Sequence, residues 1–308
     1  MTVSTPTDVA ARAARPVAGI LWMVLTGLCF VAVTGIVKHV GQDMPASQAA
    51  FLRFLLGLVF FLPVLPALLR LRLDRRGWQL FGARSALHVV AVILWFYAMT
   101  QIPVAEVTAM NYLAPVYVTL GAALFLGEKL AARRLLAVAA GLLGVVIILR
   151  PGFREVSPGH LAMLGTALFF GASYLIAKRL SDRYDAAMVV AVLSVMVTVG
   201  LAPFAAAVWV TPTLPQLGWL FLVAGFATAG HYAMTRAFAA APVTVTQPVT
   251  FLQLIWATLL GAIVFSEPAD GWVVLGGAII LASVSFITWR EAQLRRQRIT
   301  PAPEATKL

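Results

Sequence analysis

A few polar side chains lie inside long apolar stretches of this 308-residue sequence, and these could bind a ligand there. Asn111 and Tyr112 lie shortly before one proline, and Gln247 and Gln253 lie on either side of another. A proline inside an apolar helix leaves a carbonyl that needs water, a side chain or a ligand. The pattern favours a polar binding site at these four residues, with a tolerated kink at each proline as the alternative.

Four ionisable residues also lie in or beside apolar stretches, where an unpartnered charge costs a few kcal/mol. Arg53 either reaches the membrane surface and holds the bundle together, or attracts a substrate carboxylate. His88 and His231 could bind substrate, or relay protons because imidazole titrates near neutral pH. Glu106 could accept a coupling proton, bind a cationic group or simply lie in water at the membrane surface. For the histidines, the alternative is a hydrogen bond between helices.

Aromatic residues occur within the apolar stretches and not only at their ends, where an interfacial belt would put them. Side chains of this kind suit a planar or cationic ligand through stacking, and core packing is the alternative for each of them. The candidates for substrate contact are Trp95, Tyr174, Tyr232 and Trp256.

The elements that must position these residues are membrane helices. With 61% hydrophobic residues, 11% charged residues and a mean hydropathy of +0.91, the chain has too little polar surface for a water-soluble globule. Each crossing needs about 20 apolar residues, so the length allows about ten helices and no soluble domain. The predicted spans are 17–37, 47–69, 81–100, 104–126, 134–149, 159–177, 187–208, 217–238, 243–265 and 271–289.

The distribution of Lys and Arg predicts the orientation of these spans. If the N-terminus is cytoplasmic, nineteen cationic residues lie on the cytoplasmic side, and only Lys38, Arg150 and Arg154 lie opposite. Positive charge is retained in the cytoplasm, so both termini are expected there. The first helix is expected to be a retained signal anchor, since its apolar run is too long for a cleaved signal peptide.

Composition and spacing argue against several other classes of protein. The net charge of +11 is scattered over separate loops, which disfavours a nucleic-acid-binding face. Cys29 is the single cysteine, so an internal disulfide is impossible, and we expect no metal site and no cofactor. A membrane enzyme would need a convergent acid/base or metal cluster, and a channel would need charge rings or filter loops. A non-transporting scaffold would not need polar groups at the centre of the membrane.

The sequence contains an internal repeat. The stretch Gly19–Lys38 aligns with Gly159–Lys178 at an offset of 140, and Pro103 and Glu128 align with Pro242 and Glu267 at an offset of 139. Because each half holds five helices, equivalent helices cross in opposite directions and the halves are inverted. We therefore predict an all-α integral membrane fold of ten transmembrane helices in two inverted five-helix repeats. Its parts are an N-terminal tail (1–16), the repeats (17–150 and 159–290) and a C-terminal tail (291–308).

Short motifs give this sequence a resemblance to ten-helix EamA-type members of the drug/metabolite transporter superfamily. They are Phe51-Leu-Arg-Phe54, the run from Ala109 to Val116, Leu126-Gly-Glu-Lys129, Leu149-Arg-Pro-Gly152 and Phe265-Ser-Glu267. The last departs from the family pattern, because Ser266 replaces the usual glycine and Pro268 follows.

The resemblance implies a transporter of a small organic metabolite, such as an amino acid, S-adenosylmethionine or riboflavin, and not an enzyme. It implies alternating access through a central cavity lined by the first, third, fourth, sixth, eighth and ninth helices. The expected location is a bacterial inner membrane. Rows of small residues at Ala137, Gly141 and Gly144 and at Gly277, Ala278 and Ala282 predict close packing, within the bundle or across a homodimer.

Overall fold

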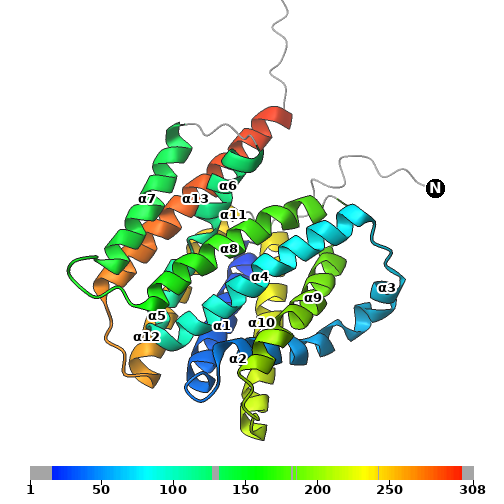
Figure 1. The fold of residues 1–308 in the computed structure, drawn as a ribbon. Coiled ribbons are helices and arrows are strands. Elements are labelled where there is room, and N and C mark those ends of the chain that lie inside the picture. Colours follow the sequence, from blue (N-terminus) through cyan, green and yellow to red (C-terminus); the bar gives the residue numbers. More distant parts are fainter. Residues whose placement is uncertain (1–15, 127–131, 182, 185, 242, 300–308) are drawn as a thin grey trace, which may run out of the picture.

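The computed structural model describes residues 16–299, except 127–131, 182, 185 and 242, and every regular element in these ranges is a helix (Figure 1). The elements are α1 (Pro16–Val40), α2 (Ala46–Gly57), η2 (Leu58–Val64), α3 (Leu65–Arg70), α4 (Arg75–Gln101), α5 (Val104–Asn111), α6 (Ala114–Leu126), α7 (Ala132–Leu149), α8 (Pro158–Ser181), α9 (Ala186–Ala207), α10 (Leu214–Ala240), α11 (Val243–Thr246), η3 (Gln247–Thr250), α12 (Phe251–Val264) and α13 (Gly271–Ile299).

In the described ranges, eight helical stretches are long and apolar enough to cross a membrane, and Pro248–Val264 is a shorter apolar helix. The chain is therefore a multi-pass membrane protein. The predicted spans 104–126 and 243–265 are interrupted: α5 ends at Asn111 before α6 begins, and the 3-10 turn η3 precedes α12. The prolines near both positions explain the interruptions, because a proline cannot donate a helical hydrogen bond.

Two helices, α4 and α13, extend furthest beyond the predicted spans. The helix α4 begins at Arg75, six residues earlier than predicted, because the Asp74 carboxylate accepts a hydrogen bond from the Gly77 N–H at 2.8 Å and caps it. The helix α13 continues to Ile299, through the start of the predicted C-terminal tail. Its polar extension contains Arg, Gln and Leu, which are good helix formers without burial.

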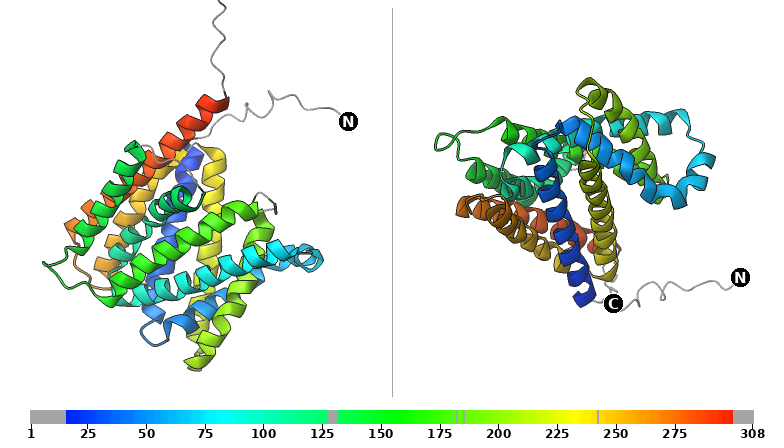
Figure 2. Two further views of the ribbon diagram at one scale, coloured as in Figure 1. Left: turned by 45° about the horizontal axis from the view of Figure 1, so that its top comes forward. Right: turned by 90° about the horizontal axis from the view of Figure 1, so that it is seen from below.

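The most extensive helix contacts are those of α1 with α10, α4 with α8, and α7 with α13, and the members of each pair lie side by side (Figures 1 and 2). At the repeat offset, α1 corresponds to α8, and α4 corresponds to α10. The α1–α10 pair in one half-to-half contact therefore corresponds to the α8–α4 pair in the other. The α7–α13 pair joins the last helix of each half.

Backbone groups of α7 and α13 approach each other closely. A Cβ added at Gly144 would lie 2.7 Å from both the Gly276 carbonyl oxygen and the Ile280 side chain, and one added at Gly141 would lie 3.1 Å from the Ser283 hydroxyl. The Ser283 hydroxyl also donates to the Ala137 carbonyl of α7. Small residues thus allow these two helices to touch, as membrane helix interfaces require.

We expect Gly144→Val to lower the free energy of unfolding by about 1–3 kcal/mol, because the new side chain meets backbone atoms that cannot move aside. The loss would be measured as a lower melting temperature of the detergent-purified protein. Gly82→Ala is the matched control, since a Cβ at Gly82 meets nothing within 4 Å. Equal melting temperatures for both variants would contradict the packing shown here.

Candidate functional site

Arg53 on α2 and His88 on α4 lie at the centre of a group of aromatic side chains. The Arg53 guanidinium lies 4.1 Å from the centroid of the Phe54 ring, and it makes no hydrogen bond or ion pair with any described residue. The Nδ1 atom of His88 lies 3.3 Å from the Ser173 hydroxyl of α8. A membrane-interior cation without a protein partner is costly, and a ligand can supply the missing partner.

Rings from two other helices, α2 and α8, contact His88. Its imidazole lies 6.2 Å from Phe54 of α2 and 4.9 Å from Phe170 of α8, as ring-centroid distances. Phe170 in turn contacts Trp95 at 6.0 Å and stacks on Tyr174 at 5.9 Å with an interplanar angle of 7°. The Trp95 indole nitrogen is buried and has no hydrogen-bond partner among the described residues. The cluster thus offers aromatic ring faces for stacking, together with hydrogen-bond donors that have no partner among the described residues.

His231 of α10 faces the same region. Its imidazole lies 5.2 Å from the ring of Phe30 on α1, and it is within electrostatic reach of both Arg53 and His88. We call Arg53, His88, Trp95, Phe170, Tyr174 and His231 the interior cluster, although Tyr174 is 43% exposed and His231 is also exposed. Five of these six residues were predicted as site candidates from the sequence, and Phe170 was not.

The amide-rich candidates lie elsewhere, at the helix interruptions. The Tyr112 hydroxyl donates to the Thr250 carbonyl at 2.9 Å, so a side chain at one interruption satisfies a backbone oxygen beside the other. Asn111 is half-buried, and its side chain has no hydrogen bond to a described residue. Gln253 and Trp256 of α12 lie against Gly27 of α1. The side chain of Gln247 lies outside the described residues.

Tyr232 is separated from both groups and 57% exposed. Its ring contacts Trp22 edge-on at 6.2 Å, and Arg236 donates to its hydroxyl at 3.2 Å. These three residues are near the start of α1 and the end of α10.

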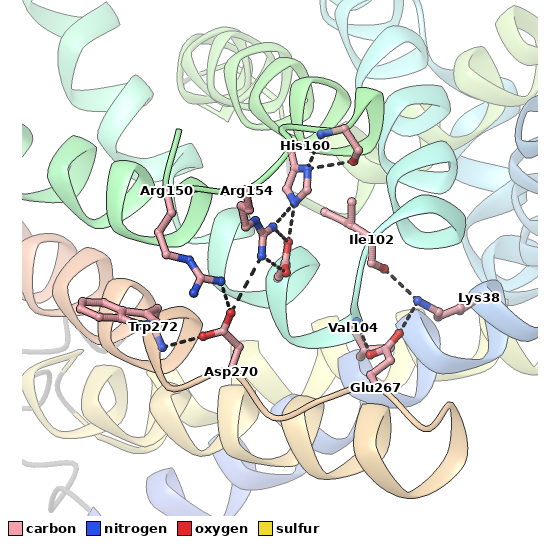
Figure 3. Close-up of polar contacts among 11 residues, drawn as sticks. Lys38, Ile102, Val104, Arg150, Arg154, His160, Glu267, Asp270 and Trp272 are labelled. Carbon is pink, nitrogen blue, oxygen red and sulfur yellow. Dashed lines mark hydrogen bonds and ion pairs between the residues drawn. The ribbon is translucent and has the colours of Figure 1, made fainter. Parts of the chain in front are cut away.

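At the opposite end of α1, ionic contacts join this helix to its neighbours (Figure 3). Lys38 forms an ion pair with Glu267, and its ammonium donates to the Ile102 carbonyl at 2.9 Å. The other carboxylate oxygen of Glu267 accepts the Val104 N–H at 2.9 Å. The sequence left any function for Glu267 open, and the structure shows that it bonds to both α1 and the start of α5.

Glu106, the candidate for proton coupling, lies in a buried ionic group with Arg154 and His160 (Figure 3). Its oxygens accept hydrogen bonds from the Arg154 guanidinium at 2.8 and 2.6 Å and contact His160 Nε2 at 2.5 Å. The Ser157 N–H donates to His160 Nδ1 at 3.0 Å, so the ring proton resides on Nε2 and points to Glu106. Hydrogen bonding to Glu106 raises the pKa of Arg154.

Arg150 and Asp270 form a further ion pair beside this group, between the end of α7 and the start of α13. We call the end of the bundle with these contacts the ion-paired end. All three cations that the charge count placed on the non-cytoplasmic side, Lys38, Arg150 and Arg154, are neutralised here by carboxylates.

Sequence reasoning missed His160 and Asp270. The one available signal for His160 was its place three residues after Ser157 at a helix start, where a capping residue reaches back to the backbone. Nothing local marks Asp270, because its partner Arg150 is 120 residues away. No three His, Cys, Asp or Glu side chains gather as a metal site would require, among the residues described.

A cavity of about 190 Å³ lies between α6, α8 and α13. It is lined by Pro115, Val118, Thr119, Tyr174, Val284, Ile287 and Thr288. Tyr174 therefore connects this cavity with the interior cluster.

The model of the EamA-like transporter family matches residues 17–150 and again residues 157–289. The chain belongs to this family. The interruptions, the interior cluster and the ion-paired end are thus features of an EamA transporter, and the recognition made from the sequence motifs is confirmed.

Similar proteins include a riboflavin transporter of Vibrio cholerae, 32% identical over 92% of this chain and 97% of that protein. A riboflavin transporter of Rhizobium johnstonii is 34% identical, covering 95% and 97%. An S-adenosylmethionine uptake transporter of Rickettsia bellii is 25% identical, covering 91% and 97%. This EamA protein is therefore a small-metabolite transporter, as predicted.

A solved structure supports the fold alone. A protein crystal structure superposes with a TM-score of 0.57 at 18% identity, covering 90% of this chain and 98% of that one.

Proposed function

We propose that this EamA transporter moves a riboflavin-like metabolite across a bacterial inner membrane, and that the interior cluster binds it. The observation that carries the proposal is Arg53, a cation inside the bundle without a hydrogen bond or ion pair among the described residues. Its partner would be an electron-rich or anionic group on the substrate.

The charge of the cluster discriminates between the substrates of the similar proteins. The helices α2, α4, α8 and α10 contain no aspartate or glutamate, so they offer no countercharge for a cation. S-adenosylmethionine could pair its carboxylate with Arg53, but its sulfonium and ammonium groups would find no countercharge on these helices. Riboflavin is neutral at pH 7, and its pyrimidinedione edge presents carbonyl oxygens and a ring nitrogen that accept hydrogen bonds. Charge complementarity therefore favours the flavin.

The shape of the cluster favours the same class. Trp95, Phe170 and Tyr174 offer ring faces on which a planar tricyclic ligand can stack, which is worth about 0.5–1.5 kcal/mol per ring pair beyond burial. The buried Trp95 N–H and the Arg53 guanidinium are donors for the acceptor edge of such a ring.

Alternating access is part of the proposal, with ten crossings and both termini in the cytoplasm. Counting the interrupted helices α5–α6 and α11–α12 as one crossing each gives ten alternating segments, in agreement with the charge count. The helix α1 ends at the same end of the bundle where its repeat counterpart α8 begins. Opposed directions of equivalent helices are the geometry that alternating access uses.

The remaining site candidates stay predictions. Asn111, Tyr112, Gln247, Gln253 and Trp256 would contact the substrate from the interruptions, and proton coupling would pass through Glu106 or His88. Coupling through Glu106 requires the carboxylate to give up hydrogen bonds that it now accepts from Arg154 and His160.

The test is binding and uptake by the purified protein. We expect riboflavin to raise the melting temperature in detergent, because a ligand at 100 times its Kd stabilises the folded state by about 2.7 kcal/mol. Proteoliposomes should accumulate labelled riboflavin above protein-free liposomes, and S-adenosylmethionine should do neither. Stabilisation by S-adenosylmethionine without an effect of riboflavin would refute the proposed substrate.

A further inference from the structure

The ion pair between Lys38 and Glu267 joins the two halves of the transporter at the ion-paired end. Lys38 lies in the last turn of α1, in the first half, and Glu267 follows α12, in the second half. The pair also holds the connection between α4 and α5, through the Ile102 carbonyl and the Val104 N–H. Four helix ends are thus fastened at one point (Figure 3).

Both side chains are largely shielded, with exposed fractions of 13% for Lys38 and 12% for Glu267. The Lys38 ammonium also lies 5.7 Å from the centroid of the Phe265 ring. Shielded charges interact much more strongly than charges in water, and removing one partner leaves the other buried and uncompensated. The pair therefore adds a real energetic barrier to separation of α1 from α12.

The cavity lies far from this closure. Tyr174 is 16 residues from the start of α8, and Ile287 is 16 residues from the start of α13. At 1.5 Å per residue, both lie about 24 Å from the ion-paired end, towards the predicted cytoplasmic side. The cavity between α6, α8 and α13 therefore lies away from the ion pairs, towards the opposite end of the bundle.

The neighbouring pair Arg150–Asp270 differs in one respect. It joins α7 to α13, and these helices are already in backbone contact at Gly144 and Gly276. The two halves therefore cannot separate between Arg150 and Asp270 without also breaking the α7–α13 interface.

We propose that the Lys38–Glu267 ion pair is the reversible closure of the ion-paired end, and that it separates once in every transport cycle. The inference rests on the alternating access proposed above, but not on the identity of the substrate. In each cycle the end of α1 moves away from Glu267, and re-formation of the pair returns the transporter to the closed state seen here.

The experiment measures the distance across this end without any substrate. Spin labels are placed at Gln42→Cys and Ala269→Cys, both exposed positions, in a Cys29→Ser background, and distances are measured by pulsed electron paramagnetic resonance. We expect one short-distance population with the native ion pair. Lys38→Met with Glu267→Gln removes both charges together, and a second population longer by about 5 Å or more should appear, the size of a one-turn helix shift.

Two further variants make the result decisive. Glu267→Asp keeps the charge but shortens the side chain, so it should show the same longer population even if the double variant does not fold. Arg150→Met with Asp270→Asn is the matched control at the same end and should leave the distances unchanged. An unaltered distribution in the Lys38 and Glu267 variants, or an equal change in the control, would overturn the proposal. Failure of riboflavin to bind would leave this readout intact.

Discussion

Arg53→Ala is expected to weaken riboflavin binding at least tenfold and to leave the ligand-free protein as stable as before or more stable. A hydrogen bond to a charged group contributes about 1.5–3 kcal/mol, which sets the loss of affinity. The contact with the Phe54 ring is worth about 2 kcal/mol when desolvated, whereas an unpartnered charge in the membrane costs a few kcal/mol. Removing the guanidinium therefore relieves the cost of an unpartnered charge in the membrane, and this gain at least offsets the loss of the contact with the Phe54 ring.

The measurement pairs a titration of flavin fluorescence with the melting temperature of the ligand-free protein. Arg179→Ala is the control for a loss of charge, because Arg179 is exposed at the end of α8. A variant that melts several degrees lower and keeps its affinity would show that Arg53 clamps the bundle, which was the alternative interpretation of the sequence.

Glu106→Ala should lower the free energy of unfolding by about 3–5 kcal/mol, the usual loss when one partner of a buried ion pair is removed. Glu106 is 3% exposed and His160 is 4% exposed, so little water can replace the carboxylate. The guanidinium of Arg154 would lose both of its short hydrogen bonds. Unfolding in a graded denaturing detergent measures the difference.

Glu155→Ala is the control, since this carboxylate is exposed on the loop that contains Arg154 and should change stability by less than about 0.5 kcal/mol. If the two variants unfolded alike, the ionic group around Glu106 would not hold the helix ends together. Glu106→Gln in proteoliposomes separately tests proton coupling, because a coupled transporter would lose its response to a pH gradient.

The sequence predicted the helical elements well because apolar length and charge are local properties. The apolar run of each long span can be counted directly, and the excess of Lys and Arg on alternate loops predicts their orientation. The interruptions near Pro115 and Pro248 were also foreseeable, since the missing N–H of proline is a property of a single residue.

The spatial grouping of the site residues was harder to predict from the sequence. Equal depth along two helices does not determine the direction in which each side chain points around the bundle axis. Trp95 and Tyr174 meet through Phe170, whereas Gln253 lies against Gly27 of α1. Angular position depends on how all the helices pack, and a single sequence contains no measure of it.

The ionic contacts were not predictable for a related reason. Glu267 meets the Val104 N–H across 163 residues of sequence, and only the assembled bundle brings them together. The charge count treated Lys38, Arg150 and Arg154 as the minority on one side, and their pairing with carboxylates explains why that side tolerates them.

The contact between α7 and α13 also bears on the evolutionary origin of the two repeats. At the repeat offset of 139 residues, Gly144 corresponds to Ser283, Gly141 to Ile280, and Ala137 to Gly276. The contact of Gly144 with Ile280 is thus the counterpart of that of Gly141 with Ser283. The hydrogen bond from Ser283 to the Ala137 carbonyl likewise matches the approach of Gly144 to the Gly276 carbonyl. An interface in which each partner uses the same patch is that of a two-fold homodimer, so a single five-helix ancestor could have assembled through this surface before its gene was duplicated and fused.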